Sequence, residues 1–224
     1  MDKIDCSLDK VAEGSNFPTD KSKYGHNYNK VYSKYFEEFR DDPIKILEIG
    51  VAYGASAQMW AKYFSNATIV SIDHDISHYE YPPNDRIVII KADQRDKSTL
   101  ENINQQYGPF DIIIDDGSHI DEYTKISFDI LFPLLKSGGL YVVEDLHTSY
   151  HDVVHGIANK PVFINYCKEL VDYVNAHGYC MSGNLIKCSE NVDYQYCEHR
   201  KITEMDKLIE FIHFYKSLVF IKKY

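Results

Sequence analysis

Residues 44–73 read IKILEIGVAYGASAQMWAKYFSNATIVSID. Two short apolar runs, 44–49 and 68–72, flank a stretch whose spacing predicts a helix over 55–64. Continuous runs of isoleucine and valine are typical of strands that are covered on both faces of a parallel sheet. A strand, a helix and a second strand in this order predict a βαβ unit.

The same alternation continues along the chain after this unit. Further strands are expected over 86–91, 111–114 and 140–143, and further helices over 98–107 and 121–136. Alternating strands and helices predict an α/β fold with a doubly wound, mostly parallel sheet. Two β-favouring runs at the end of the chain, 209–215 and 217–222, almost touch. We therefore expect a closing β-hairpin or an antiparallel edge, which makes the sheet mixed.

Two further helices are expected outside this alternation. Apolar residues recur at helical spacing over 27–40, until the sequence Asp41-Asp42-Pro43 ends the run. A helix over 161–177 would begin with a proline in its first turn and end before Gly178. The pattern assigns no element to residues 184–201.

Composition limits the class of function. The 224 residues include 24 Lys and Arg against 34 Asp and Glu, a net charge of −10 that opposes binding of nucleic-acid phosphates. The five cysteines are odd in number and contain no C-x-x-C pair, so neither a disulfide framework nor a zinc knuckle is indicated. No apolar stretch reaches about 18 residues, and the first residues do not form a signal peptide. We expect a cytoplasmic protein that binds neither nucleic acid nor membranes.

The turn after the first predicted strand is a candidate ligand site, because open α/β sheets bind ligands beyond the carboxyl ends of their strands. Gly50 would let a ligand approach the backbone closely. Ala52 stands where a dinucleotide fingerprint would have its second glycine, which weakens a pyrophosphate site. Glu48 would repel a diphosphate and attract a cationic amino-acid group. A purely structural turn remains an alternative.

Polar residues also follow the second and third predicted strands. Asp73 ends the second strand, where a carboxylate can accept both hydroxyls of a ribose. Asp93 and Gln94 follow the third strand and offer groups suited to hydrogen bonding with an adenine edge. Alone, this last pair is more often part of an ordinary turn.

Acidic residues follow two consecutive strands, as DDGSH over 115–119 and EDLH over 144–147. If these strands are neighbours, several carboxylates converge and require a cation. Oxygen ligands favour Mg²⁺, so we expect Asp116, Glu144 and Asp145 to hold it. His119 could then act as the general base toward an alcohol that the metal acidifies. The alternative is that these acids cap helices and His119 packs in a loop.

Three stretches carry a resemblance to a known family: LEIGVAYGAS (47–56), FDIIIDDGSHI (110–120) and LFPLLKSGGLYVVEDLHTSY (131–150). With them, the sequence resembles the class I S-adenosylmethionine-dependent methyltransferases, and among these the Mg-dependent sugar O-methyltransferases of macrolide biosynthesis, of the mycinamicin type. The resemblance implies a seven-stranded Rossmann-like sheet with a C-terminal antiparallel strand, and S-adenosylmethionine and Mg²⁺ as cofactors.

The resemblance also implies roles for individual residues. It assigns Asp116, Glu144 and Asp145 to the metal and His119 to the base. It implies that the methyl donor is contacted by Gly50, Asp73, Asp93 and Gln94, with Ser56 and Asp115 as neighbours. The segment Thr19-Asp20-Lys21 and His26 match a region that borders the active site in such enzymes.

We therefore expect a single methyltransferase domain with four parts: an N-terminal helical cap (1–42), a core that binds donor and metal (43–150), an acceptor-side insertion (151–208) and the closing hairpin (209–224). The expected reaction is methylation of a hydroxyl of a sugar or another small polar acceptor, with assembly into a homo-oligomer left open. Methylation of a non-sugar oxygen such as a phosphoramidate, a carboxylate-metal hydrolase, and a non-catalytic nucleotide-binding domain are the alternatives.

Overall fold

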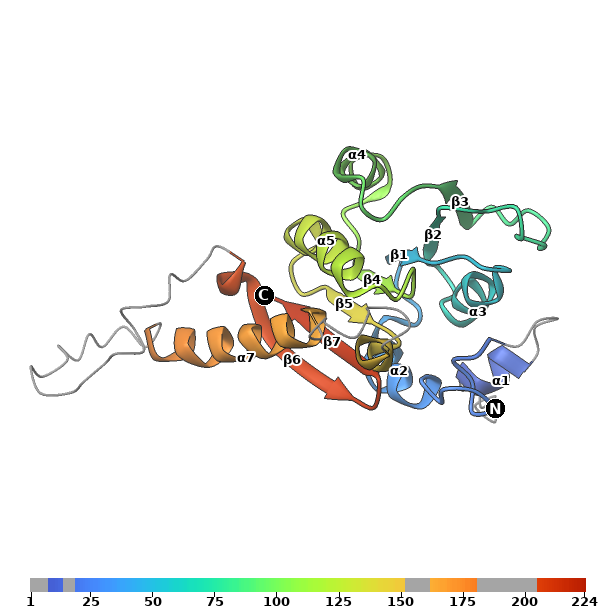
Figure 1. The fold of residues 1–224 in the computed structure, drawn as a ribbon. Helices are drawn as coiled ribbons and strands as arrows, with labels where there is room; N and C mark the ends of the chain where they lie inside the picture. The colour runs from blue at the N-terminus through green and yellow to red at the C-terminus, as the bar shows by residue number, and fades with distance from the viewer. Residues whose placement is uncertain (1–7, 14–18, 152–161, 181–204) are drawn as a thin grey trace, which may run out of the picture.

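Seven strands form one sheet in the order β3-β2-β1-β4-β5-β7-β6 in the computed structural model of the chain (Figure 1). The structure describes residues 8–13, 19–151, 162–180 and 205–224. The strands are β1 (Lys45–Ile49), β2 (Thr68–Asp73), β3 (Ile87–Lys91), β4 (Ile112–Asp115), β5 (Leu140–Val143), β6 (Ile209–Tyr215) and β7 (Leu218–Lys223). The first five pair in parallel, while β7 is antiparallel to both β5 and β6. The predicted fold class, including the antiparallel C-terminal end, is confirmed.

Helices cover both faces of this sheet (Figure 1). The helices are α1 (Leu8–Glu13), α2 (Asn29–Phe36), α3 (Ala55–Tyr63), α4 (Lys97–Tyr107), α5 (Asp121–Leu131) and α7 (Val162–Cys180), with short 3-10 helices at Glu37–Phe39, Phe132–Leu134, Leu146–Tyr150 and Asp206–Leu208. Helices α4, α5 and α7 pack on one face and α1, α2 and α3 on the other, each over its own cluster of buried apolar residues. Among the described residues, no helix is both long and apolar enough to cross a membrane.

Three predicted helices differ from those observed in where they end. The helix expected over 161–177 does not stop before Gly178 but continues to Cys180 as α7. The helix expected over 121–136 stops at Leu131 and continues as one 3-10 turn, because Pro133 has no N–H to donate and its ring crowds the preceding turn. The helix expected over 27–40 divides into α2 and a 3-10 turn over Glu37–Phe39. Residues 184–201, for which the sequence pattern predicts no element, lie outside the described part of the chain.

The strand register determines which loops meet at the carboxyl edge of the sheet. Ile49 of β1 pairs with Asp115 of β4, and Asp115 pairs with Val143 of β5. The residues that follow these three strands therefore begin at the same level. The strand order also reverses at β1, because β2 and β3 lie on one side of it while β4 and β5 lie on the other. Such switch points are where α/β folds bind ligands.

Candidate active site

Two adjoining cavities open at this edge of the sheet. The first, which we call the Asp93 cavity, measures about 430 Å³ and is lined by residues that include Asp93, Gln94, Arg95 and Tyr123. The second, the Lys21 cavity, measures about 420 Å³ and is lined by residues that include Lys21, Ser56, Asp116 and His119. Gly50, Asp73 and Gly117 line both cavities, so the two share one wall.

Gly50 brings the turn after β1 against the turn after β4. Its backbone has φ +100°, and a Cβ at this position would lie 2.1 Å from the backbone oxygen of Asp116. Side chains other than hydrogen do not fit this approach. The glycine therefore sets how closely the two loops that form the shared wall can meet.

Asp73 is held by the same turn. Its Oδ2 accepts hydrogen bonds from the backbone N–H groups of Val51 at 2.8 Å and Ala52 at 3.3 Å, and its Oδ1 accepts one from Asp75. Burial opposes ionisation, but the three backbone donors outweigh it and lower the pKa of Asp73. Asp73 is thus a fixed, ionised carboxylate that faces both cavities.

Asp93 and Gln94 are placed at the cavity wall, but their polar atoms are already engaged. Arg95 donates to both carboxylate oxygens of Asp93 and lies over the ring of Tyr123, with 4.4 Å between guanidinium and ring centre. This pairing lowers the pKa of Asp93 to about 2. The Oε1 of Gln94 accepts from the backbone N–H of Ser118 at 3.0 Å, so Gln94 also holds the loop that follows β4.

Glu48 and Asp115 point away from the two cavities into the protein. Trp60 and Ser71 donate hydrogen bonds to the two oxygens of Glu48, which is fully buried. Asp115 accepts from Ser127 and from the backbone of Gly117, and burial raises its pKa to about 6. Asp115 therefore holds the loop after β4, while Glu48 joins α3 to β2, and a contact of either residue with a donor stays a prediction.

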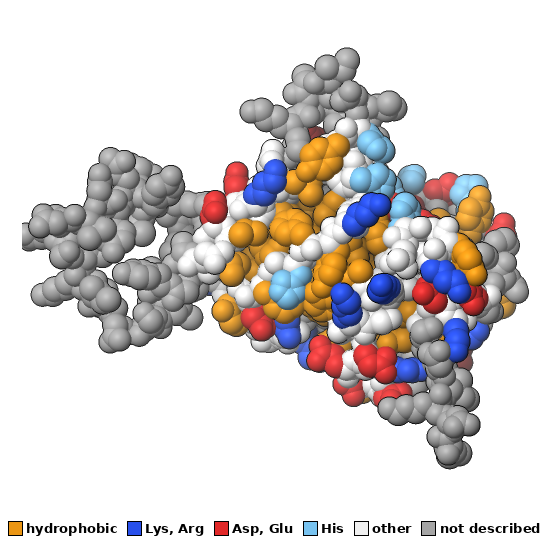
Figure 2. Space-filling model, turned by 90° about the horizontal axis from the view of Figure 1, so that it is seen from below, with side chains coloured by type: hydrophobic (Ala, Val, Ile, Leu, Met, Phe, Trp, Pro, Cys, Tyr) orange, Lys and Arg blue, Asp and Glu red, His pale blue; other side chains and the backbone are white. Residues whose placement is uncertain are grey.

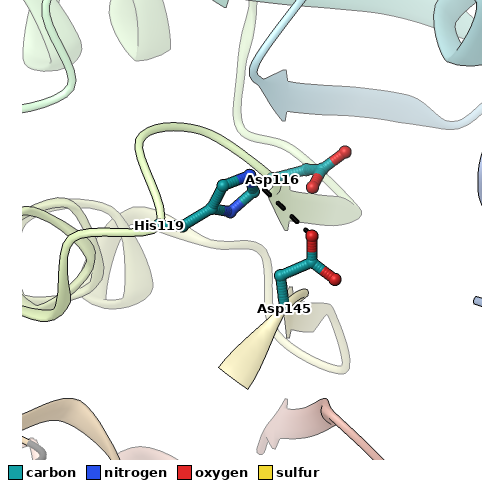
Figure 3. Close-up of side chains that lie close together, drawn as sticks. All are labelled: Asp116, His119 and Asp145. Carbon is teal, nitrogen blue, oxygen red and sulfur yellow. Dashed lines mark ion pairs between the residues drawn. The ribbon is translucent and has the colours of Figure 1, made fainter. Parts of the chain in front are cut away.

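Asp116, His119 and Asp145 form a cluster at the end of β4 and β5 (Figure 3). One potential ligand atom from each lies within 4.8 Å of the others, and His119 Nε2 is 3.8 Å from Asp145 Oδ2. His119 and Asp145 both adopt the left-handed backbone region, with φ values of 56° and 53°. Such conformations are costly for residues other than glycine and concentrate at functional sites.

Glu144 lies deeper, and both of its oxygens are engaged. Lys21 donates a 3.0 Å hydrogen bond to Glu144 Oε2, and Tyr32 of α2 donates a 2.6 Å bond to Oε1. The same ammonium group donates to Asp116 Oδ2. Lys21, 1% exposed, is therefore a buried cation that joins the acids of two neighbouring strands.

Crowding is visible in the pKa values of these acids. Burial raises the pKa of Asp116, and the Lys21 ammonium only partly offsets the effect. Burial, followed by the charge of Asp116, raises the pKa of Glu144 well above its usual value. A further hard cation would relieve this repulsion, and carboxylate oxygens are the ligands that Mg²⁺ prefers. The donor set therefore fits the expected metal, although Glu144 would reach it only by changing partners.

Asp145 connects this cluster to a third cavity. Tyr28 donates a 2.6 Å hydrogen bond to Asp145 Oδ1, and His26 and His147 each have a ring nitrogen 3.9 Å from the same oxygen. The three residues also line what we call the Phe214 cavity, which measures about 590 Å³. Its remaining walls come mainly from the loop after β5, α7 and the β6–β7 turn, and they include Leu146, Tyr150, Ile164, Phe214, Tyr215 and Lys216. On the face seen in Figure 2, histidines gather beside an exposed apolar area.

Sequence reasoning missed several of these residues. Tyr28, which precedes α2, and Tyr32 within it belong to the apolar stripe predicted over 27–40. That stripe indicates only a helix that packs on a core, and nothing in its spacing reveals the hydroxyl contacts with Asp145 and Glu144. Lys21 and His26 were indicated only by a short resemblance. Ser56 was placed beside the donor by resemblance, and it does line the Lys21 cavity.

Comparison with known proteins agrees with this geometry. Residues 47–146 match a family model described as a methyltransferase domain. The chain is 34% identical over 212 residues to the 8-demethyl-8-α-L-rhamnosyl tetracenomycin-C 2'-O-methyltransferase of Streptomyces olivaceus, over 90% of this chain and 51% of that protein. It is 40% identical over 144 residues to the mycinamicin VI 2''-O-methyltransferase of Micromonospora griseorubida, over 61% of this chain and 35% of that protein.

A solved structure extends the likeness to the whole fold. MycE from the mycinamycin biosynthetic pathway, in complex with Mg and SAH, matches 97% of this chain and 54% of its own with a TM-score of 0.79 and 31% identity. The chain thus spans about half the length of that protein, as it does of the tetracenomycin enzyme. Residues 47–146 thus match the methyltransferase-domain family, and the chain as a whole has the seven-stranded methyltransferase fold of MycE and is similar in sequence to the mycinamicin and tetracenomycin O-methyltransferases.

Proposed function

We propose that the protein is an S-adenosylmethionine-dependent, Mg²⁺-assisted O-methyltransferase that acts on a hydroxyl of a sugar or another small polar acceptor. The observation that carries the proposal is the shared wall of the Asp93 and Lys21 cavities. Gly50, Asp73 and Gly117 line both, so a nucleoside in one cavity would lie directly beside the acidic cluster in the other. The relatives named above are O-methyltransferases, and MycE was solved with SAH and Mg.

The Asp93 cavity would hold the adenosine part of the donor. Asp73, ionised and fixed by backbone donors, would accept the ribose hydroxyls. Asp93 would lie at the adenine edge, with Arg95 and Tyr123 beside it. Gly50 allows close approach of the donor, and Ser56 borders its methionine end in the Lys21 cavity. Gln94 and Asp115 would position these groups through the loop after β4, which both bind, and Glu48 would do so through Trp60 of α3 and Ser71 of β2.

Asp116, Glu144 and Asp145 would hold the Mg²⁺ ion. When bound, S-adenosylmethionine supplies an electrophilic methyl group, and Mg²⁺ supplies a Lewis acid that orients and acidifies the acceptor hydroxyl. Asp116 and Asp145 already face a common space with His119 (Figure 3). The domain division would follow from these roles, with residues 43–150 binding donor and metal and 151–208 contributing to acceptor choice.

His119 would accept the proton of the acceptor hydroxyl. Its Nε2 is 3.8 Å from Asp145 Oδ2, so the carboxylate would stabilise the imidazolium that forms. The side chain of His119 is 35% exposed toward the Lys21 cavity, which leaves the ring accessible to a bound substrate.

The acceptor would occupy the Phe214 cavity and extend its reacting hydroxyl past Asp145 to His119, which lines the Lys21 cavity. The Phe214 cavity adjoins Asp145 through Tyr28, and its walls combine aromatic rings with the polar groups of His26, His147 and Ser217. Aromatic faces and hydrogen-bonding side chains suit the alternating apolar and hydroxyl surfaces of a sugar. The name of the first relative, a rhamnosyl tetracenomycin-C 2'-O-methyltransferase, supports a glycosylated acceptor.

Calorimetric titration of the protein with S-adenosylhomocysteine, NAD and Mg²⁺ tests the proposal. Binding of S-adenosylhomocysteine but not NAD is the expected result, with Mg²⁺ binding independently of it. Binding of Mg²⁺ without binding of S-adenosylhomocysteine would favour a carboxylate-metal hydrolase, and binding of neither would favour a non-catalytic role. A screen of sugar conjugates for the mass gain of one methyl group would then identify the acceptor.

A further inference from the structure

Lys21 is placed where a cation between Asp116 and Glu144 would lie. Its ammonium group donates to Asp116 Oδ2 and to Glu144 Oε2, the latter at 3.0 Å. Asp116 and Glu144 follow the neighbouring strands β4 and β5, whereas Lys21 precedes α2 and is 95 residues away from Asp116 in sequence. The chain thus brings its own positive charge to the two acids from a distant segment.

The surroundings hold Lys21 firmly in this position. Its backbone carbonyl accepts a hydrogen bond from the N–H of Asn29 at 2.9 Å, and its own N–H donates to Thr19 Oγ1 at 3.3 Å. Tyr32, one turn along α2 from Asn29, donates to the other oxygen of Glu144. The position of the ammonium group is therefore fixed by backbone contacts at the start of α2 as well as by the acids.

A divalent cation would bind the same carboxylates that this ammonium group contacts. Each carboxylate oxygen that donates electron density to a metal becomes a weaker acceptor for Lys21, and two cations at hydrogen-bonding distance of one carboxylate repel each other. From this geometry we infer that Lys21 is an internal counter-ion that competes with the divalent cation for Asp116 and Glu144 and so lowers the metal affinity of the site. The inference rests on the proposed function, because it takes these acids as metal ligands.

Substitution of Lys21 by methionine tests the competition, because methionine keeps a similar length without the charge. Calorimetric titration of the chelator-treated full chain with Mg²⁺ and with Mn²⁺ should show binding tighter by on the order of tenfold in Lys21→Met than in the unsubstituted protein. The rise in melting temperature on adding Mg²⁺ should also be larger in Lys21→Met. A residue with a purely structural role would have the opposite effect, since its loss would loosen the acids and weaken the metal.

Two matched variants separate charge from packing. Lys21→Arg keeps the positive charge between the two acids and should therefore not tighten metal binding as Lys21→Met does. Tyr32→Phe removes a neutral hydrogen bond to the same carboxylate and should not tighten metal binding. Tightening in Tyr32→Phe equal to that in Lys21→Met would show that freeing Glu144, rather than removing a charge, is responsible, and would overturn the inference.

A measurement on the unsubstituted protein covers the case in which Lys21→Met does not fold. The ¹⁵N resonance of the Lys21 ammonium group, identified by its absence in Lys21→Arg, should shift as Mg²⁺ saturates the site, and an unchanged resonance would overturn the inference. If the unsubstituted protein binds Mg²⁺ and Lys21→Met binds it equally or more weakly, only the inference fails. If neither binds Mg²⁺ or Mn²⁺, the metal-assisted function fails with it.

Discussion

The two cavities that share Gly50 and Asp73 are stabilised in opposite ways. On the side of β2 and β3, the carboxylate of Asp73 is surrounded by backbone N–H donors that lower its pKa. On the side of β4 and β5, Asp116 and Glu144 are buried next to each other, and their pKa values are raised. On the first side, protein groups already stabilise the negative charge of the acid, whereas the second side carries an excess of negative charge that favours a cation. Ligand preference at one sheet edge is thus set by what surrounds each acid rather than by the acids themselves.

The largest effect is expected on the crowded side. Asp116→Ala removes a carboxylate that faces the Lys21 cavity and the His119 cluster, so methyl transfer in the presence of Mg²⁺ should fall at least about a thousandfold. Binding of S-adenosylhomocysteine should change little, because its proposed contacts, apart from Ser56, lie in the Asp93 cavity or in the wall that the two cavities share. A turnover assay and calorimetry on the same preparation check both. Full activity of the unsubstituted protein in excess chelator would remove the metal from the mechanism.

The shared wall should be the next most sensitive feature. Gly50→Ala places a Cβ 2.1 Å from the backbone oxygen of Asp116 at a φ of +100°, and we expect the free energy of unfolding to fall by about 3 kcal/mol. Gly138→Ala is the matched control, because Gly138 also has a positive φ, of +76°, but nothing lies within 4 Å of its added Cβ. Its cost should be about 1 kcal/mol. Equal losses in urea unfolding would show that the close approach of the two loops contributes nothing.

A smaller effect is expected on the backbone-stabilised side, and it should depend on pH. Asp73→Asn should lower the free energy of unfolding at neutral pH by about 1–2 kcal/mol, because hydrogen bonds to a charged acceptor are replaced by neutral ones. The folded pKa of Asp73 is lowered, so the stabilisation is present above the usual pKa of aspartate and is lost as the pH falls through the folded value. Urea unfolding at neutral pH and at about pH 2 checks this. A difference between the two proteins that stays constant with pH would contradict it.

The smallest effect is expected from Tyr32→Phe. This change removes one neutral donor to Glu144 and leaves the charge of Lys21 in place, so the free energy of unfolding should fall by about 1 kcal/mol. Thermal unfolding with and without Mg²⁺ measures it. A loss of unfolding free energy as large as that in Gly50→Ala would contradict this, because the Tyr32 hydroxyl would then contribute as much to stability as the glycine in the shared wall.

The fold and the location of the site could be predicted from sequence because both follow local patterns. Alternating apolar runs fix the strands, and the residues after the strands meet at one edge once the strands are parallel, which brought together Asp73, Asp116, His119 and Asp145. The orientation of Glu48 required a further step. Successive side chains of a strand point to opposite faces, so Glu48 shares a face with Ile46 and lies against Trp60 of α3 rather than at the strand end.

Contacts across long sequence separations could not be predicted in this way. Lys21 and Tyr32 lie 123 and 112 residues before Glu144, and they reach it only because α2 packs against the sheet beside β5 and β7. A lysine in a polar loop and a tyrosine on an apolar stripe have no local signal that distinguishes them from a solvated charge and a core aromatic residue. Their role depends on tertiary packing, which periodicity does not describe.

The left-handed backbone at His119 and Asp145 has a consequence for how this protein could be engineered. Glycine would relax the chain at both positions, but Asp145→Gly would also remove the acceptor of the 2.6 Å hydrogen bond from Tyr28, so a selection for heat resistance alone should favour only His119→Gly. That gain would delete a side chain from the cluster proposed to carry the chemistry. Thermal tolerance and the proposed turnover are therefore in direct conflict at His119, and a stabilised version of the protein is better sought in segments remote from it.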